Sequence, residues 1–187
     1  VIGSAENHAA VLDMARKSIV LLKNENQLLP LKKNNQKIAL IGALAADKTS
    51  PLGSWRIAAD DNTAVSVLEG MQKYVGSNLL YEKGPDYFLG KPAFTEEVQI
   101  NYSDKTGMDR ALEVAAKADV VVLVMGEHGF MSGEARTRTE IGLPGFQQEF
   151  LEAIYRVNKN VVLVLNNGRP LALPWAAEHI PSIVEAW

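Results

Sequence analysis

Helical and strand-like hydrophobic periods alternate along this chain. Apolar residues at helical spacing predict helices over residues 7–23, 63–75, 108–117, 145–157 and, as a short patch, 175–179. Asn7 and Thr63 are expected to cap the first two of these helices. Short apolar runs bounded by turn residues predict strands over residues 37–42, 78–84, 119–126, 160–167 and 182–187.

The most apolar strands are continuous rather than alternating, as VVVLV (120–124) and VVLVL (161–165) show. Such runs are typical of strands buried on both faces, which occur in parallel sheets covered by helices. We therefore expect an α/β fold, a three-layer sandwich whose mostly parallel sheet is covered by helices on both faces. The stretch 85–107 mixes proline, glycine and aromatic residues without a period, so it is expected to be a long surface loop.

Unusual residues follow three of the predicted strands. In open parallel sheets ligands bind beyond the carboxyl ends of the strands, which directs attention to the loops after Ile41, Met125 and Leu165. These loops contain GSWRIAADD, GEHGFMSGEARTRTE and NNGRPL, respectively. Their carboxylates, arginines and tryptophan are the candidates for chemistry.

Composition excludes several classes of partner. The chain has 187 residues, of which 47% are hydrophobic, enough for a sizeable core. With a net charge of -3 it lacks the basic surface that attracts nucleic acid or anionic membranes, and neither partner is expected. The absence of cysteine rules out disulfides and thiolate chemistry. The opening VIGSAENHAA does not have the pattern of a signal peptide.

Familiar catalytic and cofactor motifs are also missing. The turn after the first predicted strand, IGALAADKTSPLG, does not match the glycine pattern of a dinucleotide site, and no Walker A motif is present. Ser132 stands one place too late for a nucleophile elbow. The histidines have no spacing that places two on one face as metal ligands. We expect neither a cofactor nor a metal.

Five motifs in order carry a resemblance to a known family. VLLKN with LLPL, GSW, VVVLVMGE, GEARTRTEIGLP and NNGRPL resemble the second, α/β sandwich domain of family 3 glycoside hydrolases, especially of the bacterial periplasmic β-glucosidase type. In that family a TIM-like barrel carries a nucleophilic aspartate, and the second domain lends an acid/base glutamate. The resemblance implies that residues 1–35 are the interdomain linker and first helix, and 36–187 the sandwich domain, truncated at its C-terminus. The N-terminal barrel is absent from this chain.

The resemblance also implies an activity. The full-length protein is expected to be a retaining exo-acting β-glucosidase that acts on β-linked glucosides or oligosaccharides, with the barrel as this domain's partner. The 187-residue chain alone is expected to be inactive, and a periplasmic or secreted location follows from the resemblance only. The alternative is a non-catalytic regulatory α/β module that binds a nucleotide or metabolite at the same strand ends.

Glu134 is the candidate acid/base. Retaining hydrolysis needs two carboxylates roughly 5 Å apart, one a nucleophile and one a proton donor. Glu134 matches the family's acid/base position in GEARTRTEI and follows Gly133 in a loop expected to be mobile, which would let it close over a bound sugar. From the residues alone, an ion pair between Glu134 and Arg136 or Arg138 is the alternative.

Glu127 is the rival acid/base. It stands immediately after a predicted strand, where a carboxylate more often caps a helix or pairs with an arginine such as Arg169. We therefore expect Glu127 and Arg169 to be structural residues beside the site.

Candidate sugar contacts come from the first two loops. Trp55 is expected to stack on a pyranose ring, as the resemblance implies for the leaving-group subsite, with a buried core anchor as the alternative. Arg56 and Arg136 are candidates for hydrogen bonds to sugar hydroxyls, or else for ion pairs. His128 is expected to pack within its loop, with sugar contact as the alternative.

Overall fold

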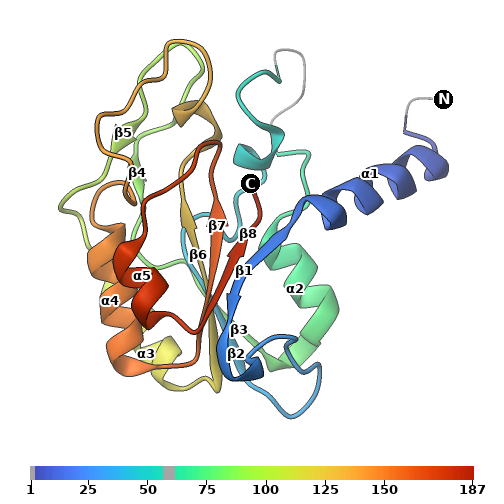
Figure 1. The fold of residues 1–187 in the computed structure, drawn as a ribbon, viewed down its shortest axis with the longest axis vertical. Coiled ribbons are helices and arrows are strands. Elements are labelled where there is room, and N and C mark those ends of the chain that lie inside the picture. Colours follow the sequence, from blue (N-terminus) through green and yellow to red (C-terminus); the bar gives the residue numbers. More distant parts are fainter. Residues whose placement is uncertain (1–2, 57–61) are drawn as a thin grey trace.

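The computed structural model describes residues 3–56 and 62–187, so residues 57–61 of the GSWRIAADD loop lie outside the described residues (Figure 1). The helices are α1 (Ala5–Ser18), α2 (Val67–Val75), α3 (Met108–Ala116), α4 (Gln147–Val157) and α5 (Pro174–His179). The strands are β1 (Val20–Asn24), β2 (Ile38–Ile41), β3 (Leu79–Glu82), β4 (Phe88–Leu89), β5 (Gln99–Ile100), β6 (Val120–Gly126), β7 (Val161–Asn166) and β8 (Ser182–Glu185). Short 3₁₀ turns include η2 (Ser50–Leu52) and η4 (Gly129–Met131).

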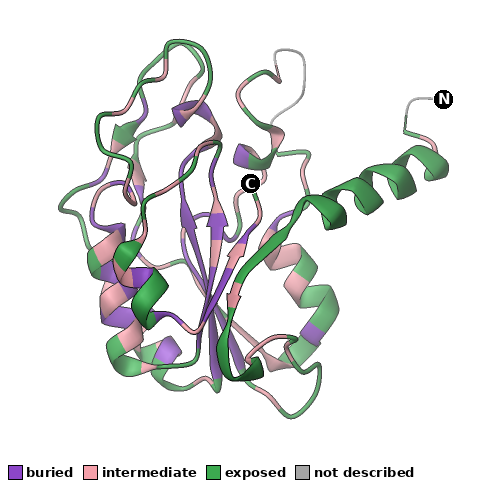
Figure 2. Cartoon of the chain, viewed as in Figure 1, coloured by how far each residue is buried: buried purple, intermediate pink, exposed green. Residues whose placement is uncertain are grey.

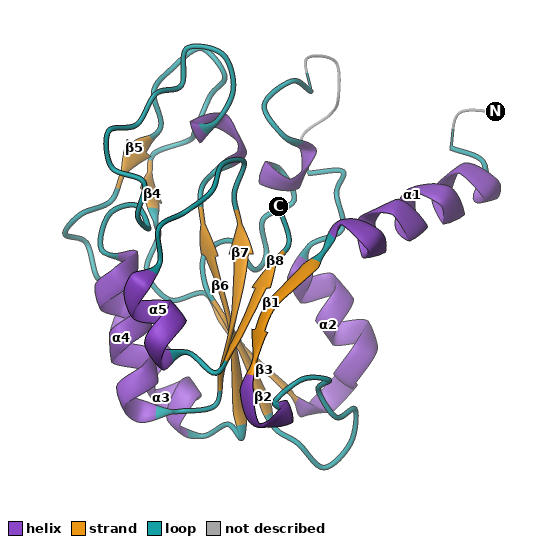
Figure 3. Ribbon diagram, viewed as in Figure 1, coloured by secondary structure: helices purple, strands orange, loops and turns teal. Residues whose placement is uncertain are grey.

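The main sheet has the strand order β1-β8-β7-β6-β2-β3. All neighbouring pairs are parallel except β1, which runs antiparallel to β8. Every residue of β2 and β6 is buried, as the continuous apolar runs predicted. In Figure 3, α3, α4 and α5 lie on one side of the sheet and α2 lies on the other. The predicted α/β sandwich with a mostly parallel sheet is confirmed.

The first predicted helix is wrong beyond Ser18. Helix α1 ends there, and the chain continues as β1, whose backbone pairs with the open edge of β8. The run Val20–Leu22 favours a strand, because β-branched and large apolar residues pair well across an edge. No residue of α1 is buried, and the helix projects from the body of the molecule (Figure 2).

Both predicted N-caps are also wrong. Ser4 caps α1, since its side-chain oxygen accepts a hydrogen bond from the backbone N–H of Asn7 at 3.2 Å. Ser66 caps α2 in a reciprocal capping box with Glu69, which starts the helix three residues later than Thr63 would. In both helices the serine side-chain oxygen accepts from the backbone N–H three residues later, and this hydrogen bond marks where the helix begins.

The segment 85–107 is mostly an exposed loop, as its sequence predicts, but it contains unpredicted ordered structure. It forms the small antiparallel sheet β4–β5, and Tyr87 is only 1% exposed. The Tyr87 hydroxyl donates to the carbonyl oxygen of Val124 in β6 at 3.1 Å, and burial raises the pKa of this phenol. Asn101 fixes the other end of the segment by donating to the carbonyl oxygens of Asp86 and Asp104. The segment is thereby held over the carboxyl end of the main sheet.

No helix within the described part of the chain is long and apolar enough to cross a membrane.

Candidate active site

The site is built where β6 and β7 end side by side. At Gly126 the backbone has φ 132°, and a Cβ there would lie 2.1 Å from the carbonyl oxygen of Asn166. Only glycine allows this approach. Gln147 at the start of α4 holds the same glycine, accepting from its N–H at 2.9 Å and donating to its carbonyl at 2.8 Å. The direction in which Glu127 leaves the strand is therefore fixed.

Glu127 lies beneath the loop rather than on its surface. It is 2% exposed, and its two carboxylate oxygens accept from different arginines. Arg138 Nη1 donates to Oε1, and Arg169 Nε donates to Oε2 at 3.1 Å. The predicted pair between Glu127 and Arg169 is confirmed. Two guanidinium groups compensate the buried carboxylate, so the three side chains form one charged cluster at the base of the loop.

Arg169 connects this cluster to the loop that carries Glu134. Its Nη2 donates to the carbonyl oxygen of Met131 and, at 3.3 Å, to that of Arg136. These two carbonyls stand on either side of Glu134 in the chain. The NNGRPL loop that supplies Arg169 is fixed in turn, because Asn167 Nδ2 donates to the Arg169 carbonyl at 2.8 Å and to Glu185 Oε2 at 3.2 Å. Burial raises the pKa of the Glu185 carboxyl group.

Glu134 occupies the corner of a tight turn. The backbone N–H of Arg136 donates to the carbonyl oxygen of Gly133 at 3.3 Å, and Ala135 has φ 58°. Gly133 has φ 118°, and a Cβ on it would lie 2.7 Å from the Ser54 hydroxyl oxygen. The turn thus packs against the GSW segment while the Glu134 side chain is exposed.

The loop around Glu134, which was expected to be mobile, has several anchoring contacts. Arg169 donates hydrogen bonds to backbone carbonyls on both sides of the turn. Met131 is buried beside Phe130 and Val98 in a small apolar cluster. These contacts anchor the loop on both sides of the turn, and Gly133, Glu134 and Ala135 are exposed.

A cavity of 330 Å³ lies in front of Glu134. Its walls include Trp55, Phe94, Phe130 and Arg136. Trp55 is 59% exposed, and its ring meets the Phe94 ring edge-on at 6.3 Å between centroids. The alternative of Trp55 as a buried core anchor is therefore wrong. The structure brings Glu134, Trp55 and Arg136 together around one cavity.

The arginines that were alternative partners for Glu134 bond elsewhere. Arg136 Nη2 donates to the carbonyl oxygen of Phe94, and Arg138 pairs with Glu127. Across residues 3–56 and 62–187, the structure contains no ion pair to Glu134. Glu134 lines the cavity instead.

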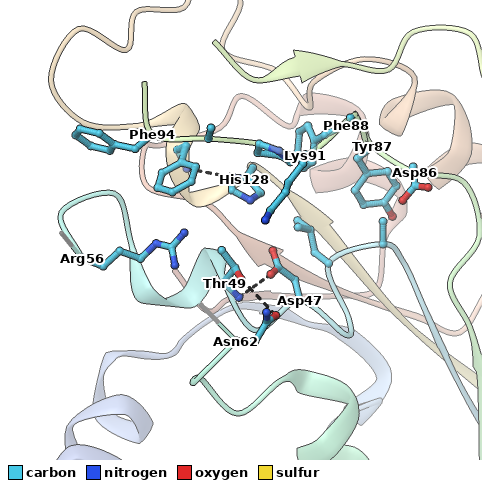
Figure 4. Close-up of a pocket in the computed structure, with 16 residues that line it drawn as sticks. Asp47, Thr49, Arg56, Asn62, Asp86, Tyr87, Phe88, Lys91, Phe94 and His128 are labelled. Atoms are coloured by element: carbon cyan, nitrogen blue, oxygen red, sulfur yellow. Dashed lines mark hydrogen bonds between the residues drawn. The ribbon is translucent and has the colours of Figure 1, made fainter. Parts of the chain in front are cut away.

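Arg56 and His128 lie around a second, larger cavity of 540 Å³ (Figure 4). The Arg56 guanidinium lies over the Phe130 ring, 4.7 Å from its centroid. His128 is buried, and its Nδ1 accepts from the backbone N–H of Phe130 at 3.1 Å, so the predicted packing within the loop is confirmed. Neither side chain lines the cavity of Glu134.

Sequence reasoning missed the residues that segment 85–107 brings to these cavities, among them Tyr87, Phe88, Lys91 and Phe94. The available signal was the density of aromatic residues in PDYFLGKPAF, which is high for a stretch of exposed loop. No group of three or more histidine or acidic side chains arranged to bind a metal occurs among the residues that the structure describes.

Known proteins with related sequences and structures support one family. The profile of the glycosyl hydrolase family 3 C-terminal domain matches residues 19–187. A periplasmic beta-glucosidase of Salmonella typhimurium is 40% identical over 184 residues, covering 94% of this chain and 24% of the relative. A beta-xylosidase of Formosa agariphila is 37% identical over 192 residues, covering 99% of this chain and 25% of the relative.

Solved structures agree with the sequence matches. The crystal structure of the beta-glucosidase from Listeria innocua in complex with isofagomine aligns over 100% of this chain and 24% of its own, with a TM-score of 0.84 and 28% identity. The chain thus spans about a quarter of the length of these relatives. With the family profile covering nearly the whole sequence, the chain belongs to glycoside hydrolase family 3, as its C-terminal domain.

Proposed function

We propose that this domain supplies the general acid/base of a retaining, exo-acting β-glycosidase, and that Glu134 is that residue. The observation that carries the proposal is the position of Glu134 at the corner of an anchored turn, where it lines the same cavity as Trp55. Relatives described as β-glucosidases and β-xylosidases favour this function over a nucleotide- or metabolite-binding regulatory module.

In the proposed mechanism the first carboxylate comes from the barrel domain. Its aspartate attacks the anomeric carbon while Glu134 transfers its proton to the departing glycosidic oxygen. A covalent glycosyl intermediate forms on the aspartate. Glu134, now a carboxylate, then removes a proton from water, which attacks the intermediate and releases the sugar with its β configuration retained. The hydrogen bonds from Arg169 on both sides of the turn would hold Glu134 in place for both steps.

The residues of this domain would recognise the leaving group rather than the cleaved sugar. Trp55 offers an exposed aromatic face to the first ring of the leaving group, and Arg136 lies at the wall of the same cavity. We propose glucosides as substrates, with xylosides as the second candidate because relatives of both names match. A periplasmic or secreted location is proposed from the Salmonella typhimurium relative.

The stereochemistry of the product tests the proposed function. When the full-length protein hydrolyses an aryl β-glucoside, proton NMR should show the β-anomer of glucose first, followed by slow mutarotation. First appearance of the α-anomer would contradict a retaining mechanism, and absence of hydrolysis would contradict the activity. The purified 187-residue chain should release no sugar, because the nucleophile lies on the barrel.

Trp55→Ala in the full-length protein tests the leaving-group subsite. Stacking on the Trp55 ring should contribute on the order of 1 to 3 kcal/mol, so kcat/KM for a β-linked disaccharide should fall roughly 5- to 150-fold. An aryl glucoside with a good leaving group should lose less. Trp175→Ala is the control, because Trp175 stacks on His179 within α5, away from both cavities. Equal losses for both substrates with a lower melting temperature would show that Trp55 serves stability instead.

A further inference from the structure

The larger cavity lies where the topology of the sheet predicts a ligand site. The chain leaves β2 for β3 on one side and later extends from β6 to β7 on the other, so the sheet order reverses between β2 and β6. Crevices at such switch points are the common binding sites of open parallel sheets. Ala43 and Leu44, directly after β2, and His128 and Phe130, after β6, line this cavity. We call it the switch-point crevice.

The polar groups of the crevice are mixed in charge. Asp47 forms one wall, where its Oδ1 accepts from the backbone N–H groups of Thr49 at 2.7 Å and Ser50 at 3.2 Å. In Figure 4 the ammonium group of Lys91 extends into the crevice from the opposite side, toward Asp47. Arg56 adds a second cation and Asp86 a second carboxylate to the lining.

Among the described residues of the lining, two positive and two negative side chains balance, which does not favour a phosphate or another anion. The turn after β2 also lacks the glycine pattern of a phosphate-binding loop. Donors and acceptors together in a volume of 540 Å³ suit a neutral ligand with many hydroxyl groups, and this volume falls within the range of roughly 300 to 1,000 Å³ of small-molecule sites.

A row of aromatic rings joins the switch-point crevice to the cavity of Glu134. Trp55 contacts Phe94 at 6.3 Å, Phe94 contacts Phe130 at 6.0 Å, and Phe130 contacts His128 at 5.2 Å between ring centroids. His128 meets Phe88 at 5.9 Å. Phe94 and Phe130 line both cavities. The two cavities are therefore adjacent, so an oligosaccharide bound in one can extend into the other.

We propose that the switch-point crevice is a carbohydrate subsite, which binds the sugar that lies beyond the ring stacked on Trp55. The inference rests on the proposed function. It means that the full-length enzyme favours β-linked oligosaccharides of three or more units over disaccharides, because only the longer substrates reach the crevice.

Lys91→Met in the full-length protein tests this subsite. The quantity to measure is the ratio of kcat/KM for a β-linked glucose trisaccharide to that for the disaccharide of the same linkage. This ratio should exceed one in the unaltered protein. It should fall about tenfold in Lys91→Met, mainly through KM for the trisaccharide, as expected for loss of a charge-assisted hydrogen bond. Lys73→Met, on the exposed surface of α2, is the matched control and should leave the ratio unchanged.

Two results would overturn the subsite. One is an unchanged ratio in Lys91→Met while the enzyme still hydrolyses aryl glucosides with retention, which leaves the proposed function standing. The other is an equal loss for both oligosaccharides with a lower melting temperature, which would assign Lys91 to stability. Failure of the unaltered protein to hydrolyse any β-glucoside contradicts the proposed function itself, so the two failures are distinguishable.

Discussion

Glu134→Ala in the full-length protein should slow hydrolysis of a β-linked disaccharide by roughly 10²- to 10⁴-fold, the usual effect of losing a general acid. An aryl glucoside with an activated leaving group should suffer less in the first step, because its oxygen departs without a proton. The second step still needs a base, so the glycosyl intermediate should accumulate. Added azide attacks without a base and should restore turnover, with a β-glycosyl azide as the product.

Two further variants make this experiment decisive. Glu140→Ala removes a second exposed carboxylate from the same loop, one that lines neither cavity, and should leave the rate unchanged. Glu127→Ala should slow hydrolysis without azide rescue. If azide instead rescues Glu127→Ala and has no effect on Glu134→Ala, Glu127 is the acid/base. Rescue of neither variant would show that the acid comes from another part of the protein.

The strands at the centre of the sheet were predictable because their own sequence indicates burial on both faces. VVVLV and VVLVL are too apolar to face water on either side, and their glycine or asparagine ends mark where they stop. The edge of the sheet was not predictable in this way. Residues 20–24 satisfy a helical period as well as a strand, and the open backbone of β8, some 160 residues away in the sequence, decides between them.

The contribution of segment 85–107 to the site was not predictable from the sequence either. Its aromatic residues carry no period, and its order comes from single long-range bonds such as that from Tyr87 to Val124. Because this segment supplies Phe94 and Lys91, the division of the site into two cavities could not be read from the sequence. Arg56 and Trp55 are adjacent in the chain, yet they line different cavities.

The pairing of Glu127 with Arg169 was predictable, because both residues follow neighbouring parallel strands whose carboxyl ends meet. The bonds from Arg169 to Met131 and Arg136 were not, since they depend on the path of the loop between β6 and α4. They change the expected character of the loop. Its glycines permit a tight turn at Glu134, and the cluster of Glu127, Arg138 and Arg169 fixes the position of that turn.

Glu127→Gln should therefore both destabilise this domain and impair catalysis. The substitution keeps the shape of the side chain but leaves the half-buried Arg138 and Arg169 without their shared counter-charge. Breaking a buried ion pair in this way costs on the order of 3 kcal/mol, which should lower the thermal unfolding temperature of the full-length protein. Arg169 would also lose the carboxylate that orients it toward Met131 and Arg136, so kcat/KM should fall by similar factors for disaccharides and for activated aryl glucosides.

Glu149→Gln is the matched control, because it removes a carboxylate from an exposed pair with Lys105. Exposed pairs of this kind contribute about 0 to 1 kcal/mol, so this variant should melt close to the unaltered protein and retain its rate. Equal melting temperatures for the two variants would mean that the buried cluster does not hold the loop. A loss in Glu127→Gln confined to substrates with poor leaving groups would instead assign proton transfer to Glu127, because a positioning role affects every substrate that the turn must meet.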